Sequence, residues 1–334
     1  MTATAIIQSK PGIGDTIWHL PFVRAIAAAS PGGRITFLAP PTSLAAEILQ
    51  AEDCVARTLY FEHFGSELAR LGHLMRLAAL LRRHRFDTLW ILDRTNRPAV
   101  AAWLAGIPHR IGLGFGLQHF LITNPGIDRR LHDAQPFPWF KALLAAMDVP
   151  LPTTEPNLTL PPAVVAGIEA RFASMAPPWI VIGLGASHPD KDWLPAATAE
   201  FVAGVRRRTN GTVFLIGGQR QREHAGHLLA TTTGAAAVNA CDLSIVEAGA
   251  LLKLADIFVG PNSGPMNLAA AVGTPAFGLF FGNTPRLDYS KNIRMVFPDD
   301  EHAPADSGRR QISPAKVLAQ IEPYLTSGRV AAAT

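Results

Sequence analysis

Short runs of mainly apolar residues alternate along the chain with longer stretches in which apolar residues recur every three or four positions. The short runs are typical of buried strands, and the longer periodic stretches predict helices. The predicted strands are residues 4–8, 34–38, 88–92, 110–112, 179–183, 213–216, 257–259 and 276–280. The predicted helices are residues 15–29, 43–50, 67–83, 98–105, 195–208, 221–231, 245–255, 265–272 and 314–325. Strands followed by helices in this order predict an α/β fold, with parallel sheets covered by helices on both faces.

Prolines are dense in the middle of the chain, and the order of elements begins again after them. Proline lacks the N–H that a sheet interior requires, so we interpret residues 151–178 as a linker that includes a short helix at 163–175. It would join an N-terminal domain at 1–150 to a C-terminal domain at 179–334. Two such domains would place a ligand cleft between the carboxyl ends of their sheets, with the linker as a hinge. The last predicted helix, 314–325, is a candidate to pack back on the first domain.

The 334 residues carry a formal net charge of +4, and 24 of the 30 basic residues are arginines. The planar guanidinium group suits phosphate and carboxylate partners. The arginine-rich first half is equally consistent with an anionic partner or membrane surface and with a codon bias toward arginine. Nucleic acid is disfavoured, because no basic stretch is interleaved with aromatic residues. The arginines that we predict to contact acidic sugar or phosphate groups over the N-terminal domain are Arg57, Arg94, Arg97, Arg110, Arg129 and Arg130.

Cys54 and Cys241 are the only cysteines, and they match no metal-binding or redox spacing. Two isolated thiols are typical of buried residues in a reducing compartment. The first residues lack the basic segment of a secretory signal, and no apolar run approaches the roughly 20 residues that span a bilayer. We therefore expect a cytoplasmic protein, which could also lie peripherally on the inner face of the inner membrane.

The first loop that could carry chemistry is residues 9–15, between the first predicted strand and helix. Its glycines, Gly12 and Gly14, let the backbone turn tightly and approach a bound substrate. Asp15 would direct its carboxylate into the cleft as a general base. An N-cap aspartate beside turn glycines is the plainer alternative. The loop does not predict a dinucleotide site, because the spacing GxGxxG is absent.

The second loop is residues 183–193, GLGASHPDKDW. Its small residues offer backbone N–H groups, and Lys191 could neutralise phosphate oxygens, with Ser187 in the same loop. Asp190 and Asp192 suggest the metal-binding Asp-x-Asp pair of sugar transferases. The lysine between them and the helix that follows favour a capping segment instead, so we predict no metal site.

The third loop lies in residues 259–271, where a strand, a small polar turn and an alanine-rich helix follow one another. Ser263 can cap the helix, and Pro265 fits its first turn, where the missing N–H has no cost. The exposed N–H groups and the helix dipole would form an anion site that stabilises a departing diphosphate. Taken alone, the segment is equally an ordinary capped helix.

Together these loops resemble those of glycosyltransferase family 9, the lipopolysaccharide heptosyltransferases. The stretches that carry the resemblance are residues 12–21, 89–116, 183–193, 214–218 and 242–285, and the last is the most specific. The family implies a GT-B fold, in which two Rossmann-like domains face a central cleft and the second holds the nucleotide sugar. It also implies an inverting, metal-independent transfer without a cofactor to a lipid-linked or oligosaccharide acceptor.

The resemblance gives Asp15 the role of the base that deprotonates the acceptor hydroxyl. It places the nucleotide-sugar donor on residues of the C-terminal domain, which are Ser187, Lys191, Ser263 and Gly264. Glu223 and Leu243 are further candidates, for which the match to the family is looser.

Two positions depart from the family pattern in the third loop. Asn262 and Asn267 stand where the family usually has an aspartate and a histidine. Amide groups can still donate hydrogen bonds to a donor, so we keep both as donor-binding candidates. The expected activity is heptose transfer from ADP-heptose to lipopolysaccharide core or a related envelope glycan. The alternatives are another nucleotide sugar in exopolysaccharide or O-chain assembly, and a catalytically impaired scaffold that binds a sugar nucleotide.

Overall fold

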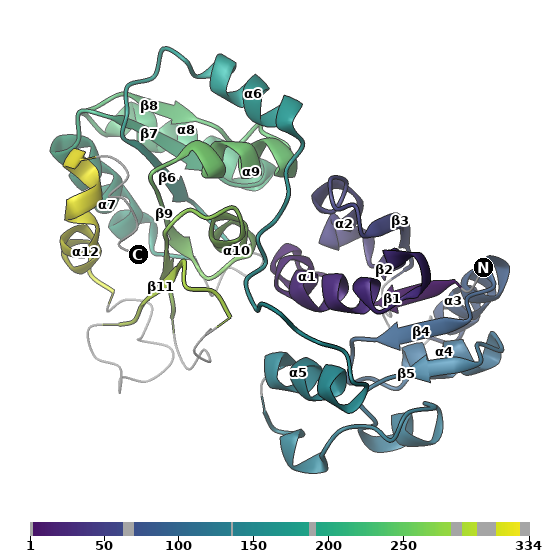
Figure 1. Ribbon diagram of the computed structural model, residues 1–334. Coiled ribbons are helices and arrows are strands. Elements are labelled where there is room, and N and C mark those ends of the chain that lie inside the picture. The colour runs from purple at the N-terminus through teal and green to yellow at the C-terminus, as the bar shows by residue number, and fades with distance from the viewer. Residues whose placement is uncertain are drawn as a thin grey trace. The chain divides into compact units, whose positions relative to one another are not determined.

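The chain divides into two compact units, Met1–Pro156 and Asn157–Thr334 (Figure 1). The structure is a computed structural model that describes residues 3–62, 70–134, 136–186, 192–281, 289–298 and 312–327. Each unit contains one parallel sheet. Within the described ranges, no helix is long and apolar enough to cross a membrane.

The N-terminal unit is built on a five-stranded sheet in the order β3-β2-β1-β4-β5, with every pair parallel. The direction of strand addition reverses between β1 and β4. Ligands of open α/β sheets bind outside the carboxyl ends of the strands at such a switch point. The loops that follow β1 and β4 therefore lie where this sheet would bind a ligand. The strands are β1 (Thr4–Ile7), β2 (Ile35–Ala39), β3 (Val55–Tyr60), β4 (Thr88–Ile91) and β5 (His109–Ile111).

Helices cover both faces of this sheet. Apolar residues of α3 and α4 are buried in one core with the alternate residues Ala5, Ile7, Leu89 and Ile91 of β1 and β4. The right-handed crossover from β1 to β2 puts α1 on the opposite face, and Figure 1 shows α1 across the strands from α3 and α4. The helices are α1 (Ile13–Ala28), α2 (Ala45–Ile48), α3 (Arg70–His84), α4 (Arg97–Leu104) and α5 (Pro136–Ala146).

The C-terminal unit repeats this design with a six-stranded parallel sheet in the order β11-β10-β9-β6-β7-β8. Its switch point lies between β9 and β6, so the loops after these two strands are neighbours. The strands are β6 (Trp179–Gly183), β7 (Thr212–Ile216), β8 (Ala237–Asn239), β9 (Ile257–Pro261), β10 (Ala276–Leu279) and β11 (Ile293–Val296).

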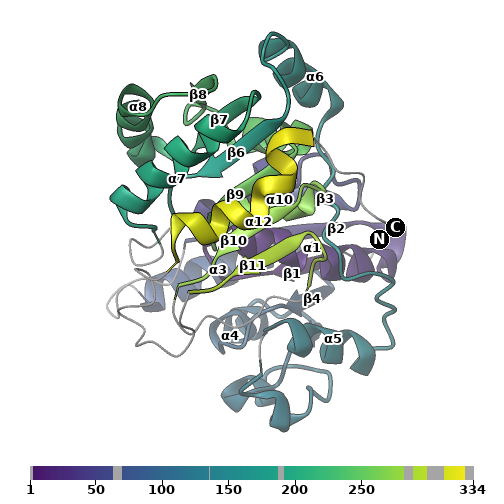
Figure 2. The ribbon, with the colours of Figure 1, turned by 90° about the vertical axis from the view of Figure 1, so that its left-hand side faces the viewer.

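One face of this second sheet is covered by α7, α8 and α12, whose apolar residues share one core with the strands. Figure 2 shows α7 and α12 in front of the sheet. The last helix, which the sequence made a candidate to pack on the first domain, packs on α7 of its own unit. A Cβ on Gly204 would lie only 2.6 Å from Leu318 Cδ1. The helices are α6 (Pro162–Arg171), α7 (Pro195–Arg208), α8 (Arg222–Thr231), α9 (Ile245–Leu254), α10 (Gly264–Ala271) and α12 (Pro314–Ser327).

Within the described residues, the predicted strands and helices are confirmed to within a few residues at their ends, but three strands and one α-helix were not predicted. Three of them, β3, β8 and β11, are strands at the edges of the sheets. Edge strands face solvent on part of their surface, and β3 has no fully buried residue, so its apolar pattern is weak. The fourth, α5, begins with Pro136 and Pro138, which interrupt the helical pattern in the sequence.

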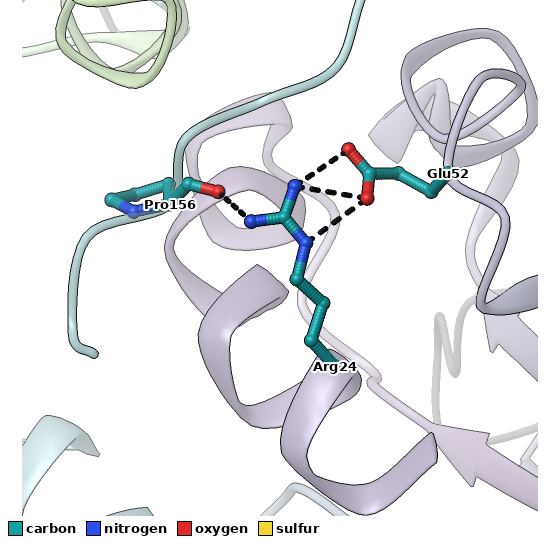
Figure 3. Close-up of polar contacts among 3 residues, drawn as sticks. All are labelled: Arg24, Glu52 and Pro156. Carbon is teal, nitrogen blue, oxygen red and sulfur yellow. Dashed lines mark hydrogen bonds and ion pairs between the residues drawn. The ribbon is translucent and has the colours of Figure 1, made fainter. Parts of the chain in front are cut away.

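A nearly buried ion pair holds the end of the N-terminal unit. Arg24 of α1 donates to both carboxylate oxygens of Glu52 at 2.9 to 3.0 Å. Its remaining amino group donates to the carbonyl oxygen of Pro156 at 2.7 Å (Figure 3). The Glu52 side chain is 4% exposed and that of Arg24 is 29% exposed. The pair therefore fixes the last residue of this unit to its first helix.

The chain is fixed again immediately after this point. The N–H of Leu158 donates to the carbonyl oxygen of Ala271, at the end of α10, at 2.8 Å. Between the two anchored positions, Asn157 adopts a left-handed conformation with a φ of 41°. Asparagine tolerates this region better than most residues. The predicted linker 151–178 thus begins in one unit and contributes α6 to the other.

Removing the Arg24 guanidinium would leave the Glu52 carboxylate buried without its counter-charge. We expect Arg24→Met to lower the free energy of unfolding of the N-terminal unit by about 3 kcal/mol. Urea unfolding followed by tryptophan fluorescence measures this, because four of the six tryptophans belong to this unit. The control is Arg76→Met, which removes an ion pair to Glu62 with both side chains 61% exposed. A loss no larger than that of the control would contradict a structural role for the pair.

His19 predicts a pH dependence of stability. The ring is fully buried where α1 packs on α5, and burial lowers its pKa from 6.5 to about 3. The hydrogen bond to the Asp15 carbonyl opposes this shift, and the charge of Lys10 adds to it. Between these pKa values the unfolded chain binds the proton and the folded chain does not, so stability falls as the pH drops below 6.5.

We expect His19→Phe to reduce the slope of unfolding free energy against pH by up to about 1.4 kcal/mol per pH unit. Urea unfolding at a series of pH values between 6.5 and 4.5 measures the slope. His119→Phe replaces an exposed histidine of the same unit and should leave the slope unchanged. Equal slopes for the His19 variant and the unaltered protein would contradict a neutral buried imidazole.

Candidate active site

Asp15 lies in the first turn of α1, directly after the carboxyl end of β1. The helix begins at Ile13, and its N-cap is Gly12 with extended backbone angles. The alternative of an N-cap aspartate is therefore wrong. The carboxylate instead accepts a hydrogen bond from the indole N–H of Trp18 at 3.2 Å, and Lys10 Nζ lies 3.7 Å from it.

The Asp15 carboxylate is accessible and lies against Gly12. Its side chain is 25% exposed. A Cβ on Gly12 would lie 2.6 Å from Asp15 Oδ2, closer than side-chain atoms approach one another in proteins. Glycine at position 12 therefore makes room for the carboxylate in its present orientation.

Arg94 follows β4, on the other side of the switch point from the Asp15 loop. Its guanidinium lies 5.7 Å from the ring centre of Trp139 in a cation–π arrangement. The Trp139 indole N–H donates to the carbonyl oxygen of Leu131 at 2.6 Å, which ends the short helix Arg129–Leu131. Trp139 thus brings two predicted acceptor-binding segments together, the Arg94 loop and the turn that carries Arg129 and Arg130.

Two of the predicted arginines, Arg110 and Arg130, already have partners within the N-terminal unit. Arg110 donates to the carbonyl oxygens of Ile107 and Leu121, each at 2.5 Å, so backbone groups account for its guanidinium. Arg130 is paired with Asp128 at 2.6 Å, and its hydrogen bonds lower the pKa of that carboxyl.

Arg57 and Arg97 lie on two other elements of the N-terminal unit. Arg57 is exposed on the edge strand β3. Burial, followed by the charges of Arg57 and Arg83, lowers the pKa of His84, which ends α3. Arg97 is half-buried as the first residue of α4.

In the C-terminal unit, the second and third loops follow the adjacent strands β6 and β9, which pair with Ile182 opposite Val259. Ser187 and Lys191 lie outside the described residues. The described ends of their loop are joined, because Asp192 accepts a hydrogen bond from the Ala186 N–H at 2.6 Å. This contact gives Asp192 a structural role at the base of the loop.

The start of α10 presents an unsatisfied hydroxyl group. Ser263 is the N-cap residue, as predicted, but its side chain makes no hydrogen bond to the helix. Its Oγ is buried and has no partner within the described part of the chain. Gly264 is the first helical residue, and half-buried Asn262 donates its backbone N–H to Leu279 at 3.1 Å. A buried hydroxyl beside the N–H groups of a helix start suits an anionic oxygen.

Asn267 stabilises this helix start. Its side chain is 8% exposed, and Nδ2 donates to the carbonyl oxygen of Ser263 at 2.7 Å. The amide therefore fixes the N-cap residue through its backbone and leaves the Ser263 hydroxyl unengaged.

The two looser candidates follow other strands of the same sheet. Glu223 is exposed in the first turn of α8, after β7, and Leu243 is half-buried before α9, after β8. The sequence did not single out Gln221, which accepts a hydrogen bond from Gly218 at 3.1 Å. A Cβ on Gly185 would lie 2.5 Å from Gln221 Nε2, so the loops after β6 and β7 are in close contact. The one sequence feature that could have indicated this contact is the glycine after each strand, Gly185 after β6 and Gly218 after β7.

Comparison with known proteins places these features in a family. Residues 74–307 match the model of the family described as glycosyltransferase family 9 (heptosyltransferase). Lipopolysaccharide heptosyltransferase 2 of Salmonella typhimurium is 24% identical, and the match covers 94% of this chain and 96% of that protein. The corresponding protein of Escherichia coli gives the same identity and coverage. Within the described residues, no group of three or more His, Cys, Asp or Glu side chains is placed to hold a metal ion.

Solved structures agree on the fold. The ADP-heptose lipopolysaccharide heptosyltransferase II of E. coli superposes with a TM-score of 0.75 at 21% identity, covering 97% of this chain and 98% of that one. A family 9 glycosyltransferase of Veillonella parvula gives a TM-score of 0.77 at 15% identity, covering 97% of each chain. The fold is GT-B, built from two Rossmann-like domains. The protein belongs to glycosyltransferase family 9 (heptosyltransferase) and is a glycosyltransferase.

Proposed function

We propose that the protein is an inverting, metal-independent glycosyltransferase that moves heptose from ADP-heptose to a lipopolysaccharide-core acceptor. The observation that carries this proposal is the accessible Asp15 carboxylate at the carboxyl end of β1, the place where such a sheet binds ligands. The names of the relatives in Salmonella and E. coli supply the heptose and the lipopolysaccharide acceptor.

In the proposed reaction, Asp15 accepts the proton of an acceptor hydroxyl as the oxygen attacks the anomeric carbon of the donor. The new glycosidic bond forms on the face opposite the bond that breaks. The bond between the anomeric carbon and the phosphate oxygen breaks with its electron pair, and the nucleoside diphosphate leaves. General base catalysis by a carboxylate typically contributes about 100- to 10,000-fold to such a step.

The C-terminal unit would bind the donor and stabilise the departing diphosphate. The start of α10 supports this role, because its N–H groups and the unpartnered Ser263 hydroxyl suit phosphate oxygens. Lys191 would add a positive charge and Ser187 a hydroxyl. Glu223 would contact the ribose and Leu243 the base. Because these hydrogen-bond donors and this positive charge stabilise the diphosphate, the proposed reaction needs neither a metal ion nor another cofactor.

Asn267 is the residue that could change which nucleotide sugar serves as the donor. Where the family usually has a histidine, this chain has a neutral amide already bonded to Ser263. The donor site therefore lacks one possible cation and could favour another nucleotide sugar, as used in exopolysaccharide or O-chain assembly. A scaffold that binds the sugar nucleotide without transfer is the second alternative.

The acceptor would be an anionic glycolipid or oligosaccharide that reaches Asp15 over the N-terminal unit. The arginines that best support such a site are Arg94, Arg129 and Arg130, because the packing around Trp139 gathers their segments. Gly12 and Gly14 would let the acceptor approach the backbone. A glycolipid acceptor would place the enzyme at the inner face of the cytoplasmic membrane as a peripheral protein.

Asp15→Asn keeps the size of the side chain and removes its basicity. We expect it to lower kcat for heptose transfer at least about 100-fold, with an unchanged melting temperature. The assay follows transfer from ADP-heptose to a purified lipopolysaccharide-core acceptor. Asp53→Asn changes an exposed aspartate of the same unit and should retain full activity. Transfer by the Asp15 variant at the normal rate would rule out Asp15 as the base.

Thermal-shift measurements with ADP, GDP, UDP and dTDP, each in the presence of EDTA, test the donor. ADP should stabilise the protein, by about 2.7 kcal/mol at a concentration 100 times its dissociation constant. Ser263→Ala should weaken the effect of ADP, because the buried hydroxyl would be lost from the phosphate site. Stabilisation by another nucleotide would replace the proposed donor, and a requirement for metal would contradict metal independence.

A further inference from the structure

The two side chains that hold the Asp15 carboxylate both contact the same oxygen. The Trp18 indole N–H donates to Oδ1 at 3.2 Å, and Lys10 Nζ lies 3.7 Å from Oδ1. Within the described residues, no hydrogen bond to Oδ2 is found, and this oxygen lies against Gly12. The two carboxylate oxygens are therefore in unequal environments.

Trp18 is itself held in place by aromatic packing between α1 and α5. Its ring stacks on His19 with 3.8 Å between ring centres and on Phe140 with 5.8 Å. Phe137 adds a tilted contact at 6.4 Å. The His19 ring is in turn fixed by its hydrogen bond to the Asp15 carbonyl oxygen at 2.5 Å. Side chains packed on several sides lose rotamer freedom, so the indole N–H is directed at one point.

Lys10 contributes less to this arrangement. Its side chain is 48% exposed, and its ammonium group lies 5.6 Å from the centre of the Trp18 ring. An exposed charge is screened by water and salt, and a flexible lysine does not fix a direction. The orientation of the carboxylate therefore depends mainly on the indole.

We propose that Trp18 is a positioning residue, which holds Oδ1 of Asp15 so that Oδ2 receives the proton of the acceptor. This inference rests on the proposed role of Asp15 as the general base. A hydrogen bond to one oxygen restricts the rotation of a carboxylate, so the other oxygen would be held toward an attacking hydroxyl. The helical spacing of three residues between Asp15 and Trp18 places both side chains on one face of α1.

Trp18→Phe tests the inference, because it keeps an aromatic ring against α5 and removes the N–H. We expect kcat to fall about tenfold, because a hydrogen bond to a charged group is lost, with unchanged KM for both substrates. A purely structural role of Trp18 would instead lower the melting temperature and leave the kcat of the folded protein unchanged. Trp103→Phe, a change at a 57% exposed ring of the same unit, is the control and should alter none of these quantities.

Gly12→Ala provides an independent test that leaves Trp18 in place. The backbone of Gly12 is extended, which alanine adopts readily, so the melting temperature should be unchanged. The added Cβ would displace Oδ2, and we expect kcat to fall about tenfold or more. If Trp18→Phe fails to fold, this variant still tests whether transfer depends on the position of Oδ2.

The inference is overturned if the folded Trp18→Phe protein keeps its kcat, whether its KM is unchanged or rises. It is also overturned if Gly12→Ala keeps the normal kcat. Failure of the proposed function looks different, because Asp15→Asn would then transfer heptose at the normal rate. The two outcomes are therefore separable in one set of assays.

Discussion

Parallel pairing of every strand is the constraint on which the rest of this structure depends. Parallel strands need a crossover between each pair, so all their carboxyl ends and the loops that follow meet at one edge of the sheet. In the N-terminal unit this constraint brings the Asp15 loop and the Arg94 loop to the junction of β1 and β4. In the C-terminal unit it brings the 183–193 loop and the start of α10 to the junction of β6 and β9.

Helix α1 combines several of the functions that this arrangement requires. Its first turn carries Asp15, and the next turn carries Trp18 and His19, which connect it to α5. One further turn and a half along, Arg24 holds Glu52 and the end of the unit. The helix thus ties the proposed base, an aromatic packing layer and the exit of the chain to one rigid element, and rigid elements position reactive groups more accurately than loops do.

The proposed donor site at the start of α10 departs from the family pattern at Asn267. Asn267 fills the position of the usual histidine and satisfies the Ser263 carbonyl oxygen rather than pointing a charge at a ligand. The Ser263 hydroxyl stays without a partner in the described part of the chain. A neutral amide preserves the shape of the helix start but reduces its positive charge. We therefore expect donor selectivity to be the property of the proposed site that is most sensitive to this difference.

The sequence by itself determined the two-sheet α/β architecture, the loops that follow β1, β6 and β9, and the family. These features depend on local periodicity and on motifs, which a linear pattern contains. Only the tertiary structure decided the edge strands β3, β8 and β11, the contact between Gln221 and Gly185, and the Arg24–Glu52 pair, because they depend on neighbours distant in sequence. It also decided which arginines are engaged by backbone groups, as Arg110 is, and which oxygen of Asp15 is held by Trp18. A sequence motif can identify a carboxylate, but the direction of that carboxylate is fixed by side chains packed around it in three dimensions.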